Sequence, residues 1–122
     1  MFELKKIIFI ESGLGVDLHG QNITKAAIRA CRNAIGYNSM PGLRSFLPNQ
    51  DFNEMRVHVK LAVPCDKEHL DIKAIQDVFP YGQKTIEVVD GGLVTSSGVI
   101  LADKGDKNDL MYMVIAVVHV GY

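Results

Sequence analysis

Hydrophobic residues follow two different periods along the chain, and these periods predict a β-α-β-α-β-β-β order. Residues 4–18 carry a nearly continuous apolar run, which is typical of a strand covered on both faces. Residues 55–63 alternate between apolar and polar side chains, which predicts a strand with one wetter face. Two short strands are expected within 84–102. The last strand, 110–122, is apolar on both faces and is therefore expected at the centre of the sheet.

A helical period occurs in two segments. Asn22 is a good N-cap for the first helix. The narrow apolar face of that helix consists of Ile23, Ala26, Ala27, Ala30 and Ala34. Because alanine is small, this face implies a close approach to the sheet. A second, shorter helix is expected within 66–82, with Asp66 or Asp71 as its cap and Pro80 at its end.

Together these elements predict an α+β fold in one domain, residues 1–122. The domain would contain a mixed sheet of four to five strands with both helices packed on one face. No helix remains for the other face, although two strands are apolar on both sides. We therefore expect a homo-oligomer with cyclic symmetry, in which a partner subunit covers the sheet.

Two irregular segments interrupt the regular elements. The connection 36–53 is long and contains apolar residues, which indicates that it packs against something, for example a neighbouring subunit. Asp90, Gly91 and Gly92 are typical of a hairpin corner between the two short strands.

Composition limits which partners the protein is expected to bind and where in the cell it is expected to lie. Thirteen basic and fourteen acidic residues give a net charge of −1, so the chain lacks the strongly basic character of nucleic-acid-binding proteins. The apolar run 7–10 is too short for a signal peptide or a membrane span, which predicts a cytoplasmic protein without membrane contact. In that location Cys31 and Cys65 are expected to remain thiols.

The junction between the first strand and the first helix holds an acid and an imidazole, Asp17 and His19. The glycines around them are Gly13, Gly15 and Gly20. If this segment is extended, Asp17 and His19 point to the same side. The pair can then ligate a divalent metal such as zinc, form an oriented general base, or hydrogen bond to fix the turn. The residues alone leave all three roles open.

The start of the helix adds features suited to an anion. Gln21 and Asn22 lead into the first-turn amides, which form a natural anion site. Lys25 falls in that turn, where a positive charge opposes the helix macrodipole. Its side chain either extends into water or converges with the amides on a ligand. We therefore expect a site for a small polar or anionic molecule, with Gly13, Gly15 and Gly20 leaving room for it.

Other polar residues supply further candidates. A metal at Asp17 and His19 needs a third ligand, and the candidates are His58, Cys65 and His119. Ser96 and Ser97 form a turn before a glycine, or supply a hydroxyl nucleophile with Lys25 as its base. No nucleotide or redox-cofactor motif is visible, so an enzyme would be a hydrolase, lyase or isomerase.

The run from Gly13 to Gly20 fits the pattern G-x-G-x-D-x-H-G without a gap. This resembles the signature of a small conserved hypothetical family found in bacteria and, with a longer N-terminal extension, in plants. The following ITKAA helix and the late PYG and GG turns extend the resemblance over most of the chain. The family has no established activity, so the resemblance indicates the junction as the site without naming a reaction.

Two more distant similarities involve fewer residues. Gly15, Asp17 and His19 look like the zinc-binding strand of methylerythritol cyclodiphosphate synthase, a trimer with its site at the subunit boundary. The size and element order are similar to trimeric chorismate-mutase-like folds. Ring-opening amidohydrolases of the cyanuric acid type use Lys and Ser pairs, which would correspond to Lys25 with Ser96 or Ser97. These resemblances favour a trimer.

Two functional hypotheses follow. In the first, the junction binds a small polar or anionic molecule, with His19 as a base or metal ligand, Asp17 as its orienting partner and Lys25 holding an anion or oxyanion. In the second, the protein is a non-catalytic binding or assembly module, and Asp17 and His19 only shape the turn. If the Asp17 and His19 side chains project into a cleft beside Lys25, the first hypothesis is favoured. If they hydrogen bond only to local backbone, the second is favoured.

Overall fold

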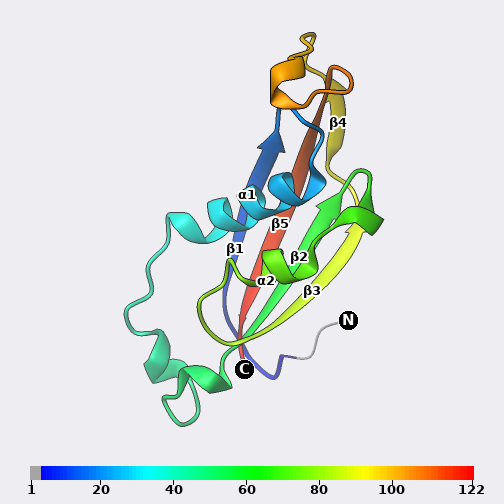
Figure 1. Ribbon diagram of the computed structural model, residues 1–122. Coiled ribbons are helices and arrows are strands. Elements are labelled where there is room, and N and C mark those ends of the chain that lie inside the picture. The colour runs from blue at the N-terminus through cyan, green and yellow to red at the C-terminus, as the bar shows by residue number, and fades with distance from the viewer. Residues whose placement is uncertain (1–3) are drawn as a thin grey trace.

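The computed structural model describes residues 4–122 and contains one mixed sheet with both helices on the same face (Figure 1). The helices are α1 (Ile23–Gly36) and α2 (Ile72–Gln76). The strands are β1 (Ile7–Asp17), β2 (Arg56–Val63), β3 (Gln83–Asp90), β4 (Leu93–Ser96) and β5 (Leu110–Gly121). The expected α+β fold and element order are confirmed. Residues 1–3 lie outside the described residues.

Strand β5 lies at the centre of the sheet, as predicted from its apolar faces. It runs antiparallel to β1 on one side and to β2 on the other, and β3 extends the sheet parallel to β2. Strand β4 pairs with the first residues of β5, where β2 has already ended. The sheet order is therefore β1-β5-β2-β3, with β4 beside β5.

The predicted hairpin corner at Asp90–Gly92 is wrong, because β3 and β4 are not neighbours in the described sheet. The two glycines instead carry the chain across the end of β2. A Cβ atom on Gly91 would stand 2.7 Å from the Cβ atom of Ala62. A Cβ atom on Gly92 would stand 2.2 Å from the carbonyl oxygen of Met113. Only glycine fits this crossing at both positions.

Small residues on both elements bring α1 close to β1. Ala26, Ala30 and Ala34 are fully buried, and Gly13 and Gly15 face them from the strand. A Cβ atom on Gly15 would stand 2.0 Å from the carbonyl oxygen of Ala26. This confirms the close approach predicted from the alanine face. It also places the first turn of α1 beside the end of β1, where Asp17 lies.

The second helix is shorter than the predicted segment 66–82. Asp66 has a left-handed φ of 55°, and a single turn of 3-10 helix follows at Lys67–His69. The next residue is extended, which interrupts the helix before it restarts as α2. Asp71 caps α2 by accepting a hydrogen bond from the Ala74 amide at 3.1 Å. The sequence pattern missed this interruption because the apolar spacing continues through it.

The long connection 36–53 packs against the core of its own subunit. It contains one short 3-10 turn, Leu43–Phe46, and enters a second at Phe52–Glu54. Leu47 is only 3% exposed. The predicted packing is therefore confirmed, whereas contact with a neighbouring subunit stays a prediction.

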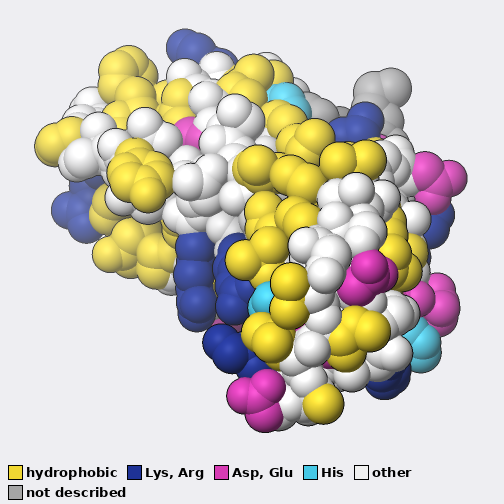
Figure 2. All heavy atoms as spheres, turned by 90° about the horizontal axis from the view of Figure 1, so that it is seen from above, with side chains coloured by type: hydrophobic (Ala, Val, Ile, Leu, Met, Phe, Trp, Pro, Cys, Tyr) yellow, Lys and Arg dark blue, Asp and Glu magenta, His cyan; other side chains and the backbone are white. Residues whose placement is uncertain are grey.

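The face of the sheet opposite the helices is called the open face below. Several large apolar side chains on it are about half exposed, namely Ile10, Leu14, Leu93 and Ile115. Figure 2 shows hydrophobic side chains over broad parts of the surface seen from above, with charged side chains between them.

None of the helices in the described part of the chain is long and apolar enough to cross a membrane.

Candidate functional site

A sharp turn joins β1 to α1 and places His19 outside the strand. Gly20 and Gln21 both have left-handed backbones, with φ of 99° and 47°. Glycine adopts this conformation without steric cost, which explains the glycine at the first of these positions. Strand β1 ends at Asp17. The alternation expected for an extended segment therefore does not extend to His19.

Asp17 fixes the start of α1. Its side chain is almost fully buried, and its Oδ2 atom accepts a hydrogen bond from the Asn22 amide at 2.8 Å. The Oδ1 atom accepts from Nη1 of Arg29 at 3.1 Å, and the same nitrogen donates to the carbonyl of Val16 at 2.7 Å. Both carboxylate oxygens therefore have partners that hold the strand against the helix.

His19 is bonded to a carboxylate from the far end of the chain. Its Nδ1 atom lies 2.6 Å from Oδ2 of Asp106, whose side chain is fully buried. The Asp106 carboxylate also accepts from the amides of Gly20 at 2.6 Å and Leu101 at 2.8 Å. We call this arrangement the Asp106 clamp, because one side chain holds the junction 17–22 against the loop 101–109.

The clamp sets the charge of Asp106 and the tautomer of His19. Burial raises the pKa of Asp106, but hydrogen bonds from the Leu101 and Gly20 amides, His19 and Gln21 outweigh burial and hold it well below its usual range. The carboxylate is therefore ionised at neutral pH and can only accept. Nδ1 of the neutral His19 ring must then carry the proton, which leaves Nε2 as the basic nitrogen.

Gln21 completes the connection between the two segments. Its Nε2 atom donates to Oδ1 of Asp106 at 2.9 Å and to the carbonyl of Leu110 at 2.8 Å. Its Oε1 atom accepts from the Lys107 amide at 2.9 Å. Asp106 has no distinguishing signal in the sequence, because it stands in a polar loop together with Asp103 and Asp109.

A polar cleft of about 670 Å³ opens over the first turn of α1, and we call it the junction cleft. One wall is the segment Gly20–Thr24, and the other residues that line it are Asp66, His69, Asp71 and Lys107. Oγ1 of Thr24 accepts from the Asp71 amide at 3.0 Å, which joins the two sides.

The first turn of α1 presents free donors at this cleft. The Asn22 side chain caps the helix by accepting from the Lys25 amide at 3.1 Å. Within the described residues, the amides of Ile23 and Thr24 have no acceptor. Amides of the first helical turn lack intrahelical partners, and the macrodipole adds positive potential at the same place.

The structure brings only part of the predicted ligand-binding set to the cleft. Gly20, Gln21 and Asn22 line it, whereas Lys25 is exposed and lies outside its walls. Gly13 and Gly15 are buried against α1 and serve the packing of the helix.

The serine pair belongs to a separate turn at the end of β4. The Ser96 hydroxyl donates to the Asp109 carboxylate, and the Ser97 hydroxyl donates to the carbonyl of Val99 at 3.0 Å. Within residues 4–122 neither hydroxyl is bonded to Lys25. These hydrogen bonds agree with the interpretation that the serines form a turn. They do not involve Lys25, the predicted base.

Two of the predicted third metal ligands, His58 and His119, lie on the open face of the sheet, whereas Asp17 is buried on the helix side. His58 is buried on the open face, with its ring nitrogens 2.8 Å from Oγ1 of Thr85 and 3.1 Å from Oε1 of Glu87. The prediction that this face of β2 is wet is therefore wrong at His58. The His119 ring is its neighbour, at a centroid distance of 6.3 Å.

Both cysteines are free thiols, as expected. Burial raises the pKa of Cys31 to about 12, so this thiol stays protonated inside α1. Burial also raises the pKa of Cys65. Within the described residues, neither cysteine belongs to a group of three metal-ligating side chains with Asp17 and His19.

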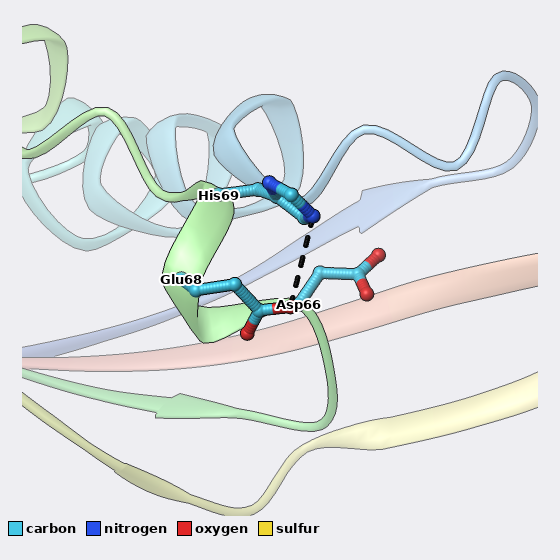
Figure 3. Close-up of side chains that lie close together, drawn as sticks. All are labelled: Asp66, Glu68 and His69. Carbon is cyan, nitrogen blue, oxygen red and sulfur yellow. Dashed lines mark ion pairs between the residues drawn. The ribbon is translucent and has the colours of Figure 1, made fainter.

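One group of three metal-ligating side chains occurs in the described part of the chain. Asp66, Glu68 and His69 offer atoms within 4.8 Å of one another. Figure 3 shows Glu68 and His69 facing each other across an ion pair of 3.6 Å, with Asp66 alongside. Asp66 is half-buried and the other two are exposed, and exposed groups of this kind are common without an ion. The cluster therefore carries no metal assignment.

Comparison with known proteins identifies the family. The family described as a conserved hypothetical protein family, Lin0512_fam, matches residues 7–120. The chain belongs to this family. A crystal structure of an FtsZ-like protein of unknown function from Nostoc punctiforme PCC 73102 is 40% identical to it, with a TM-score of 0.84. The alignment covers 94% of this chain and 93% of that chain. No curated protein matches. The resemblance inferred from the glycine-rich run is confirmed, and no activity comes with it.

Proposed function

We propose that the protein binds a small polar molecule with an anionic group in the junction cleft. The observation that carries this proposal is the polar cleft of about 670 Å³ at the first turn of α1, where the Ile23 and Thr24 amides have no acceptor in the described chain. Such amides bind phosphate and carboxylate groups in many proteins. Lys107, which also lines the cleft, adds a positive charge.

The wall of the junction cleft opposite the start of α1 indicates which other groups the ligand must carry. Asp66 and Asp71 line the cleft, and their carboxylates repel a bare anion. A ligand that also carries hydroxyl or amino groups can donate to these carboxylates. The class that fits both walls is a small phosphate ester or carboxylate with several hydroxyl groups.

His19 is the base that we propose if the bound molecule reacts. The Asp106 clamp orients its ring and leaves Nε2 as the basic nitrogen, which is the arrangement of an oriented general base. Its side chain is 20% exposed, and its neighbour Gly20 lines the cleft. A hydrolase, lyase or isomerase reaction would therefore take place at the edge of the cleft nearest Gly20.

Calorimetric titration tests the binding proposal. We expect glycerol 3-phosphate to bind more tightly than inorganic phosphate and glycerol not to bind, because only the ester satisfies both walls. Lys107→Ala should weaken binding about threefold, the effect of one exposed charge. Lys104→Ala, in the same loop but outside the cleft, should leave binding unchanged. Equal effects of the two variants, or binding of glycerol alone, would contradict the proposal.

A second candidate function is assembly with copies of the same chain. Large apolar side chains on the open face are about half exposed, including Ile10, Leu14 and Ile115. A monomer rarely exposes a broad apolar surface of this kind. We propose a cyclic homo-oligomer, with the trimer of chorismate-mutase-like folds as the favoured form.

Sedimentation measurements test this candidate. The wild-type chain is expected to sediment as a trimer at micromolar concentration. The double variant Ile10→Glu, Leu14→Glu should sediment as a monomer, because charges cannot be buried in an apolar interface. Ile72→Glu, at an exposed position on the helix side, is the control and should remain a trimer. A wild-type monomer at 100-fold higher concentration would exclude the assembly.

A further inference from the structure

The end of α1 opposite the junction cleft borders a second cavity, of about 300 Å³, which we call the loop pocket. It lies between the helix-facing side of β1, the connection after α1 and the segment after α2. Its lining is mostly apolar and includes the aromatic rings of Phe9, Phe52, Phe79 and Tyr81. Phe52 and Tyr81 stack with a centroid distance of 5.0 Å. A pocket of this kind suits the apolar body of a small molecule.

One carboxylate interrupts this apolar lining. Among the described residues that line the pocket, only Glu11 carries a carboxylate, and burial raises its pKa while a hydrogen bond from Asn38 opposes that effect. No described lysine, arginine or histidine forms an ion pair with Glu11. The carboxylate thus enters a partly dehydrated pocket with an amide as its polar partner, which leaves it short of a positive charge.

The adjacent helix end reinforces the negative potential. Ile35 and Asn38, at and after the last turn of α1, line the same pocket. That turn contains no basic residue, and the Ala34 carbonyl in it accepts a hydrogen bond from Nδ2 of Asn38 at 3.0 Å. The negative end of the macrodipole is therefore met by a neutral amide and not by a charged side chain. Aromatic faces also attract cations, and the guanidinium of Arg44 already lies over the Phe52 ring at 4.9 Å from its centroid. The Glu11 carboxylate and the helix end are therefore the two features that favour a positively charged group and disfavour an anion.

We propose that the loop pocket is a second binding site, which takes a small organic amine with an aromatic or aliphatic body. The ammonium group pairs with the Glu11 carboxylate, and the body packs against Phe52, Phe79 and Tyr81. This site is separate from the junction cleft, because the two share no lining residue. The opposite ends of α1 thus select ligands of opposite charge.

Titration of the full chain with three ligands of the same shape tests the proposal. Benzylamine is expected to bind with one site per chain, whereas benzyl alcohol and benzoate should bind at least tenfold more weakly. Glu11→Gln should weaken benzylamine binding at least tenfold. Glu68→Gln removes an exposed carboxylate outside the pocket and should have no effect.

Two further measurements show whether a loss of benzylamine binding comes from the pocket itself or from unfolding of the variant. Thermal unfolding of Glu11→Gln should be unchanged or raised, since the amide removes a partly buried charge, and a folded variant makes its binding result interpretable. If that variant does not fold, Tyr81→Ala, at a half-exposed wall position, should weaken benzylamine binding about threefold. Equal binding of benzoate and benzylamine, or unchanged benzylamine binding by a folded Glu11→Gln or by Tyr81→Ala, would overturn the proposal.

Discussion

Gly15→Ala is expected to destabilise the protein by about 3 kcal/mol, because the added methyl group has no space between β1 and α1. Its Cβ atom would stand 2.0 Å from the carbonyl oxygen of Ala26 and 2.2 Å from the amide nitrogen of Ala30. Both are backbone atoms of a buried helix, so they cannot rotate away. Relief requires α1 to move off the strand, which opens the core along its length. Urea unfolding, followed by circular dichroism, measures the loss.

Gly36→Ala is the matched control, since it makes the same substitution at the last residue of α1. A Cβ atom there meets nothing within 4 Å, and the backbone is not left-handed. Alanine is the better helix former, so this variant should be as stable as the wild type or up to about 1 kcal/mol more stable. If both glycine variants have the same stability, the close contact between β1 and α1 is not as described.

Asp106→Ala is expected to lower the Tm by roughly 10 °C, because several partly buried donors lose their acceptor together. These donors are His19, Gln21 and the amides of Gly20 and Leu101. Without the clamp the junction is no longer held against the loop 101–109. The variant should therefore also lose binding of glycerol 3-phosphate at a temperature where it remains folded. Asp103→Ala, three residues earlier and exposed, should change neither property.

The pH dependence of Asp106→Asn provides a second check on the clamp. The pKa of Asp106 in the folded protein lies well below its usual range. Ionised Asp106 therefore contributes stability that is fully present above the unfolded pKa of about 3.9 and is lost as the pH falls further. The difference in Tm between wild type and Asp106→Asn should be largest above pH 4 and should narrow below it. A difference that stays constant down to pH 2 would contradict the assigned hydrogen bonds.

The fold was largely predictable because its signals are local. The alanine spacing of α1 indicated a close helix-strand contact, and the structure supplies the matching Gly13 and Gly15 on β1. The apolar faces of 110–122 predicted a central strand, which β5 is. The errors came where the backbone departs from local periodicity. An extended residue splits the segment 66–82, and the crossing at Gly91 and Gly92 depends on β2, a strand far away in the sequence.

The location of the site could be predicted from the sequence, but the hydrogen-bond partners of Asp17 and His19 could not. The pattern around Asp17 and His19 identified the junction, yet the two side chains have separate partners. Arg29 falls outside the apolar face of the first helix, and Asp106 is one of several acids in a polar loop. Their roles depend on contacts across 12 and 87 positions, which one sequence does not encode in its spacing. Lys25 was expected at the ligand because it shares the first turn, but its side chain lies outside the cleft.

A titration of 15N-labelled protein with glycerol 3-phosphate, followed by amide chemical shifts, tests whether the start of α1 binds an anion. We expect saturable shifts that are largest at the Ile23 and Thr24 amides, because these donors have no acceptor in the described chain. Asp106→Asn should reduce the shifts at these two amides. The absence of saturable shifts at both amides in the wild type would contradict an anion site at the start of α1.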